Sequence, residues 1–159
     1  MTSTTQSITV HAPLRAVYNQ WTQFEQFPQF MQGIERVEQV DDTTLRWTAD
    51  IAGKEASWTA KIVEQQPDQL IAWKSISGRT NNGRVTFSAM SENETQVTAQ
   101  IEYETEGVIE NVGDALGLVE SRVKGDLERF KRFIEARGQE TGGWRGTVHH
   151  GQEVDKSIV

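Results

Sequence analysis

The residues best placed to bind a ligand are aromatic. Trp47, Trp58 and Trp73 lie in three separate segments in which apolar and polar residues alternate, each on the apolar side of its segment. Phe87 and Tyr103 take the same position in two further segments. Ligand pockets are mostly apolar, so this set predicts an aromatic-lined pocket for an apolar molecule. Plain core packing explains the same pattern, because aromatic side chains bury large areas in any fold.

Glu120 is the candidate polar group of that pocket. Successive helical residues are about 100° apart, which places Glu120 within about 40° of the centre of the apolar stripe on the last predicted helix. Leu116 and Val123 belong to the same stripe and complete the predicted pocket. The Glu120 carboxylate would then anchor a ligand or exchange a proton with it. The alternative is that Glu120 turns to water and pairs with Lys124, four residues further on.

The other residue types predict no metal and no cofactor. The chain contains no cysteine, which excludes disulfides and cysteine-ligated metals. His149 and His150 are adjacent, but no further ligand lies near them in the sequence, and His11 is the only other histidine. One histidine within the fold makes no Ser-His-Asp arrangement, and the chain carries no Gly-rich nucleotide-binding motif.

Length and charge exclude several classes of protein. The chain has 159 residues, about the size of one domain. Its 16 Lys and Arg against 23 Asp and Glu give a net charge of −7, which argues against nucleic acid and anionic lipid as partners. The apolar runs are far shorter than the ~20 residues that span a bilayer, so no membrane insertion is expected. The polar first seven residues lack the features of a signal peptide, and a cytoplasmic location is the simplest expectation.

Periodicity predicts the elements that position these residues. Apolar residues at helical spacing follow Pro13 and predict a helix over 13–22, then two short helical turns to about 31. A second helix begins at about 108 or 115 and ends at Arg137, before Gly138. Period-two alternation predicts seven strands. Their expected ranges are 5–11, 33–40, 43–51, 54–64, 70–77, 83–90 and 96–104.

This order predicts an α+β fold. The six consecutive strands have short links and one apolar face, so they form an antiparallel meander that one long C-terminal helix must cover. A strongly twisted sheet would wrap around that helix and enclose a volume between the two. Residues 1–139 are then the folded domain, and 140–159 are a flexible C-terminal tail. Trp144 in this tail would dock on a partner or fold back over the mouth of the pocket.

Several stretches resemble the START-like (SRPBCC) superfamily, which includes birch-pollen-allergen-like proteins and polyketide cyclase/dehydrase and lipid-transport domains. The resemblance covers about residues 3–138, in the right order. The clearest stretch is HAPLRAVYNQWTQFEQFPQFMQGIERV, His11–Val37, with its Pro, apolar-aromatic and aromatic-Pro-aromatic elements. The others are WKSISG (Trp73–Gly78), GRVTF (Gly83–Phe87) and GDLERFKRFIEARG (Gly125–Gly138). The resemblance implies a helix-grip fold with seven antiparallel strands around the C-terminal helix.

It also implies a cavity between the sheet and that helix. The leading prediction is a protein that binds, carries or senses a small hydrophobic molecule such as a lipid, a quinone or a polyketide-like compound. The alternative is an aromatase/cyclase- or dehydrase-type enzyme that uses Glu120 and Tyr103 on a polyketide-like substrate in the same cavity. An interaction protein that acts through its tail is the third hypothesis. Oligomeric state stays open among all three.

Overall fold

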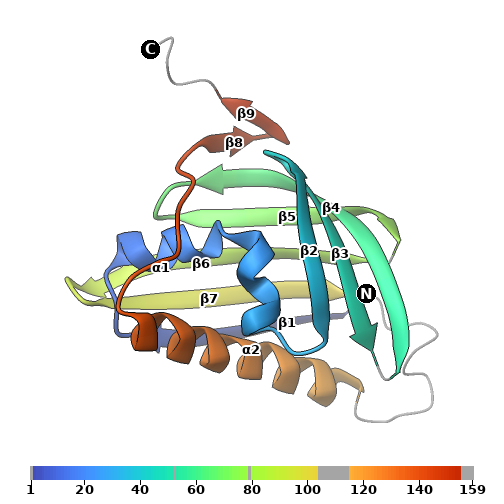
Figure 1. Cartoon of the computed structure of the whole chain (residues 1–159), viewed down its shortest axis with the longest axis horizontal. Helices are drawn as coiled ribbons and strands as arrows, with labels where there is room; N and C mark the ends of the chain where they lie inside the picture. The colour runs from blue at the N-terminus through green and yellow to red at the C-terminus, as the bar shows by residue number, and fades with distance from the viewer. Residues whose placement is uncertain (1, 52, 79, 104–114, 155–159) are drawn as a thin grey trace.

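The computed structural model describes residues 2–51, 53–78, 80–103 and 115–154. In this part of the chain an antiparallel sheet curves around one long helix, with two short helices filling the opening (Figure 1). The elements, in chain order, are β1 (Thr2–Val10), α1 (Leu14–Trp21), the 3₁₀ helix η1 (Phe24–Gln29), β2 (Ile34–Asp41), β3 (Thr44–Ile51), β4 (Lys54–Gln66), β5 (Leu70–Gly78), β6 (Asn81–Ser91), β7 (Glu94–Tyr103), α2 (Ala115–Arg137), β8 (Thr147–His149) and β9 (Gln152–Val154).

The predicted α+β helix-grip architecture is confirmed. The spatial order of the main strands is β1-β7-β6-β5-β4-β3-β2, so β2 to β7 form the expected meander and β1 pairs with its last strand. β1 and β2 are therefore neighbours in the sequence but lie at opposite ends of the sheet. The register of β4 against β5 shifts twice along its length, between Thr59 and Ala60 and between Ile62 and Glu64. Such bulges increase local twist, which lets the sheet bend around α2.

The connection between β1 and β2 supplies an aromatic core. α1 begins directly after Pro13, and Val17 and Tyr18 are fully buried on its inner face. The rings of Trp21, Phe24, Phe27 and Phe30 pack edge-on or tilted against one another, at centroid distances of 5.2–6.1 Å. Buried residues of the C-terminal half of α2 complete this core. They are Leu127, Phe130 and Ile134.

Polar contacts hold the other side of α2 to the loop before β2. The Arg129 Nε donates to the Phe30 carbonyl at 2.9 Å, and the Gln32 amide donates to Asp126 Oδ1 at 3.0 Å. Arg129 and Asp126 also pair with each other. A Cβ on Gly125 would lie 3.1 Å from an Arg129 nitrogen, so glycine leaves the room that this guanidinium occupies. Close side-chain approach thus accounts for this glycine in the middle of a helix.

Much of the segment that the sequence suggested as a flexible tail makes defined contacts. α2 ends at Arg137, Gly138 follows with a left-handed φ of 76°, and the chain then crosses α1 and adds β8 to the edge of β4 (Figure 1). The Thr141 amide donates to Gln20 Oε1 at 2.9 Å, and the Trp144 amide donates to Thr22 Oγ1 at 2.9 Å. Val148 has no exposed surface. The strands β8 and β9 have only three residues each, too few to show a period in the sequence.

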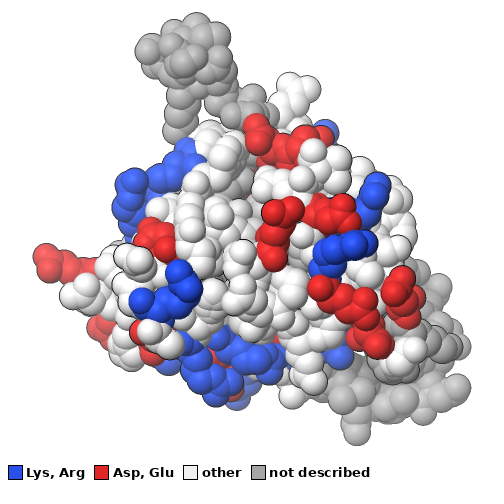
Figure 2. Space-filling view, viewed as in Figure 1, with Lys and Arg blue, Asp and Glu red and all other residues white. Residues whose placement is uncertain are grey.

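Charge is unevenly distributed over the described surface. Basic side chains gather along α2, at the lower edge of Figure 2, and acidic side chains gather over the side formed by β2 to β4. Within the described residues, neither helix combines the length and the apolar character required to cross a bilayer.

Candidate functional site

Two of the predicted pocket tryptophans stack on each other. Trp47 of β3 and Trp58 of β4 are direct partners in the antiparallel register. Their rings lie nearly parallel, 8° apart, with centroids separated by 5.8 Å. Residues that face each other across antiparallel strands are close enough for such contact, and the alternation placed both on one face. The result is a pair of stacked indoles on the inward side of the sheet, which forms the first part of a tryptophan wall.

Trp73 extends this wall along β5. It pairs with Ile62 of β4 on one side and with Gly83 of β6 on the other. A Cβ on Gly83 would lie only 2.4 Å from the Trp73 ring. Glycine at this position therefore lets the indole lie flat across β6. The Trp73 Nε1 donates to Asn81 Oδ1 at 3.2 Å, which fixes the orientation of the ring.

The exposed fraction of the inward-facing side chains differs between the two ends of α2, and the less covered end is the candidate site. The C-terminal half of α2 lies near the end of β1, because the His11 amide donates to Glu135 Oε2 at 2.7 Å. Around that end the inward residues Val85 and Val97 have 1% exposure or less. Toward the other end of α2 the inward residues Trp47, Trp73 and Ile101 are only half-buried. The inward face is thus incompletely covered at Trp47, Trp73 and Ile101, although Trp58 between them is buried, and it is solid near the C-terminal half of α2.

The Trp47 indole adds a polar feature to this wall. Its Nε1 atom is buried and has no hydrogen-bond partner among the described residues. A buried donor without an acceptor costs about 1–3 kcal/mol. Because this nitrogen is inaccessible, an oxygen of a bound molecule could accept from it only if the Trp47 side chain moved. The site is therefore an apolar aromatic surface formed by β3, β4 and β5.

The structure brings together only some of the residues predicted for the pocket. Trp47, Trp58 and Trp73 form the wall, and half-buried Val123 packs against the core from α2. Phe87 instead meets Tyr18 of α1 edge-on, at 5.3 Å, within the solid part of the core. Glu120 is half-buried on α2.

The side chains of Tyr103 and Leu116 lie outside the residues whose side chains the structure describes, although β7 and α2 include both positions. Gly83 and Ile101 were not among the predicted pocket residues, although both fall in the row that pairs across the sheet with Trp73. For Ile101 the sequence offers a signal, because it alternates with Val97 and Ala99 on the apolar side of its segment.

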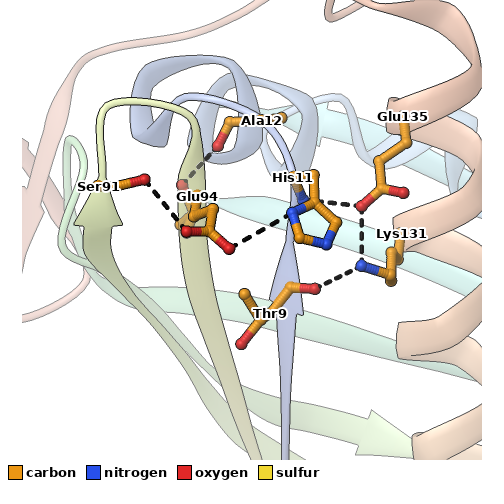
Figure 3. Close-up of polar contacts among 8 residues, drawn as sticks. Thr9, His11, Ala12, Ser91, Glu94, Lys131 and Glu135 are labelled. Carbon is orange, nitrogen blue, oxygen red and sulfur yellow. Dashed lines mark hydrogen bonds and ion pairs between the residues drawn. The ribbon is translucent and has the colours of Figure 1, made fainter.

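A second concave region lies at the opposite end of α2. It is a surface pocket of about 250 Å³, lined by the start of α1, the end of α2 and the β6–β7 turn. Its polar groups are occupied by structural contacts, as Figure 3 shows. Glu135 accepts from the His11 amide and pairs with Lys131 at 2.9 Å, and Lys131 donates to the Thr9 carbonyl at 2.7 Å. These contacts attach α2 to the edge strand β1.

This attachment predicts a loss of stability in acid. Partial burial acts to raise the pKa of Glu135, but the hydrogen bond from the His11 amide and the bond to Lys131 outweigh it, so the pKa is lowered overall. A carboxylate with a depressed folded-state pKa stabilises the fold above its unfolded pKa, about 4.3 for Glu, and loses that contribution as pH falls further. The free energy of unfolding, measured by urea titration from pH 6 to pH 3, should fall more steeply for the wild type than for Glu135→Gln. Parallel profiles for the two proteins would contradict this role of Glu135.

Comparison with known proteins agrees with this architecture. Residues 10–132 match the family model described as polyketide cyclase/dehydrase and lipid transport. An uncharacterised 17.2 kDa protein of Streptomyces lincolnensis is 49% identical over 149 residues, which are 93% of this chain and 99% of that protein.

Solved structures show the same fold. The Zhui aromatase/cyclase of a Streptomyces species has a TM-score of 0.72 at 18% identity, covering 90% of this chain and 99% of that one. A START superfamily protein of Mycobacterium smegmatis has a TM-score of 0.68 at 14% identity, covering 85% of this chain and 95% of that one. The chain belongs to the polyketide cyclase/dehydrase and lipid transport family.

Proposed function

We propose that this protein binds a small hydrophobic molecule between the tryptophan wall and the N-terminal half of α2. The observation that carries the proposal is the incomplete burial of Trp47 and Trp73 on the inward face of the sheet. Large aromatic side chains on the core side of a sheet are normally covered, as Phe87 and Val97 are at the other end. An apolar ligand would cover the remaining surface of the two indoles.

The geometry also bears on the class of ligand. The Trp73 indole lies over Gly83, so its ring can offer a face to a planar or fused-ring molecule. Trp47 and Trp58 stack on each other and cover each other's facing sides. Quinones and polyketide-like compounds offer planar apolar surface, whereas a plain acyl chain does not. We therefore favour a ring-containing molecule over a simple lipid.

The test is a binding measurement with a planar probe and a site-filling variant. We expect 1,4-naphthoquinone to quench tryptophan fluorescence of the wild type in a saturable manner, and a fatty acid to bind more weakly. Val123→Trp should lower the affinity for the quinone at least about tenfold, because a bulky side chain on half-buried Val123 occupies the space above the wall. Val40→Trp is the matched control, since Val40 is 57% exposed on β2 and its replacement should leave binding unchanged.

Two results would contradict the proposal. One is the absence of saturable binding of either probe to the wild type. The other is equal affinity of Val123→Trp and Val40→Trp, which would place any binding elsewhere on the surface. Native mass spectrometry of freshly purified protein gives an independent check, because a retained ligand adds its mass to the chain.

A second candidate is catalysis of the aromatase/cyclase type in the same site. It is favoured by the position of Glu120, half-buried on α2 one turn before Val123. Such an enzyme shapes a flexible chain and moves protons with few polar groups. If the protein converts a polyketide-like substrate, Glu120→Gln should abolish turnover while the affinity for 1,4-naphthoquinone stays the same. Unchanged turnover would leave Glu120 without a catalytic role.

A further inference from the structure

The pairing of β8 with β4 places three candidate metal ligands together. The sequence showed no third ligand beside His149 and His150, but Glu64 lies 85 residues earlier in the chain and is the direct register partner of His149. The His149 Nδ1 atom is 3.1 Å from each oxygen of the Glu64 carboxylate. The His150 ring lies beside the His149 ring, with centroids 3.9 Å apart. The ligand atoms of all three residues lie within 4.8 Å of one another.

The backbone around this cluster is well defined. β8 and β9 are joined by the two residues His150 and Gly151, whose φ angles of 53° and 77° are those of a left-handed hairpin turn. The Gly151 amide donates to the Val63 carbonyl at 3.0 Å, so the turn itself is bonded to β4. Val148 of β8 is fully buried and holds this strand against the core. The three side chains therefore project from a fixed frame.

The turn accommodates a histidine at position 150. Left-handed backbone at a non-glycine residue favours Asn, Asp and His, and Asn-Gly is the commonest pair in such a hairpin. The backbone therefore accepts His150, and the position of its imidazole next to His149 and Glu64 gives it a chemical use.

We propose that Glu64, His149 and His150 form a binding site for a divalent transition-metal ion such as Zn²⁺. Two imidazoles and one carboxylate are a donor set that Zn²⁺ takes with water as fourth ligand. Bonds of about 2.0–2.2 Å place tetrahedral ligand atoms about 3.4 Å apart, close to the spacing of His149 and Glu64. The side chain of His149 is 58% exposed, so an ion can approach it from solvent, and a small adjustment of the rings would bring the three ligand atoms to coordination distance.

The site would couple metal binding to the C-terminal segment. Glu64 belongs to β4, whereas both histidines belong to the hairpin end of the segment that crosses α1. A bound ion would join the two and reduce opening of residues 139–154. A ligand that binds only the folded form raises the free energy of unfolding by RT ln(1 + [L]/Kd), so the stabilisation grows with the logarithm of the ligand concentration.

The experiment is Zn²⁺ titration of the full chain by calorimetry, paired with thermal unfolding. We expect one Zn²⁺ per chain and a rise in Tm with Zn²⁺ concentration. His150→Asn keeps a residue suited to the left-handed turn and removes one ligand, and Glu64→Gln removes the carboxylate. Each should weaken Zn²⁺ binding at least about tenfold, which is the lower range even for changes outside the first coordination sphere.

His11→Asn is the matched control. His11 is the remaining histidine, lies 3.5 Å from the Glu94 carboxylate, and is outside this cluster, so its replacement should leave Zn²⁺ binding unchanged. Equal affinity of Glu64→Gln and wild type would overturn the proposal and show binding by the adjacent histidines alone. Absence of binding to the wild type at micromolar Zn²⁺ would overturn it outright.

Discussion

Replacing Phe130 with alanine is expected to lower the free energy of unfolding by about 3–5 kcal/mol, the usual cost of truncating a buried Phe. Phe130 is completely buried on α2. Its ring centroid lies 4.9 Å from that of Trp21 and 5.3 Å from that of Phe30. The cavity would therefore open where α2 meets the aromatic core of the β1–β2 connection. Urea unfolding followed by circular dichroism measures the change.

Phe133→Ala is the matched control for this loss. Phe133 is one turn away on α2 and also contacts the ring of Phe30, at 5.4 Å, but it is only half-buried. Its truncation removes less buried area and leaves a more open space, so we expect about 1–2 kcal/mol. Equal losses for the two variants would contradict the description of Phe130 as closed in the core and of Phe133 as lying at its margin.

Removal of residues 140–159 is expected to destabilise the protein by about 3–5 kcal/mol. Full burial of Val148 is worth about 1.5–2 kcal/mol, and half-buried Trp144 adds apolar contact. The hydrogen bonds of Thr141 and Trp144 to α1 and to Thr22 add about 1 kcal/mol each. Chemical denaturation of the truncated chain measures the difference.

A shorter truncation, after Val154, controls for this change. It keeps β8 and β9 and should leave the free energy of unfolding within about 0.5 kcal/mol of the wild type. Tyr18 offers a second measurement. Burial raises the pKa of Tyr18 to about 12, and the Arg145 cation of the C-terminal segment, 5.5 Å from the centre of its ring, acts to lower it. Burial is the larger effect, so exposure of Tyr18 in the longer truncation should move the pKa toward the ordinary value of about 10 despite the loss of Arg145, as seen by tyrosinate absorbance. If both truncated chains match the wild type, the segment is a dispensable appendage.

Local patterns explain why so much of the fold could be predicted. The alternation in 43–51, 54–64 and 70–77 predicted β3, β4 and β5 to within a few residues. The helical spacing after Pro13 predicted α1 in the same way. Both are properties of neighbouring residues, because side chains alternate across a strand and repeat every 3.6 residues on a helix. The pattern also placed Trp47, Trp58 and Trp73 on one face without any knowledge of register.

Local patterns predict nothing about contacts between residues that are far apart in the sequence and lie in segments without a period. The strand β8 is recognised only through its pairing with β4. The hydrogen bonds of Arg129 to Phe30 and of Gln32 to Asp126 likewise form only in the folded chain. Glu64 becomes a neighbour of His149 through that same pairing. None of these contacts leaves a trace in composition or spacing.

By itself, the sequence determined the elements, their order and the inward placement of the tryptophans, because each depends on the covalent geometry of a few consecutive residues. Only the tertiary structure decided how completely α2 covers that inward face: solidly at Phe130 and Ile134, and incompletely at Trp47 and Trp73. Coverage depends on how a helix is attached at both sides to strands far away in the chain. Any core contains an aromatic face. Because α2 is attached so that part of this face is left uncovered, the face becomes a candidate binding site.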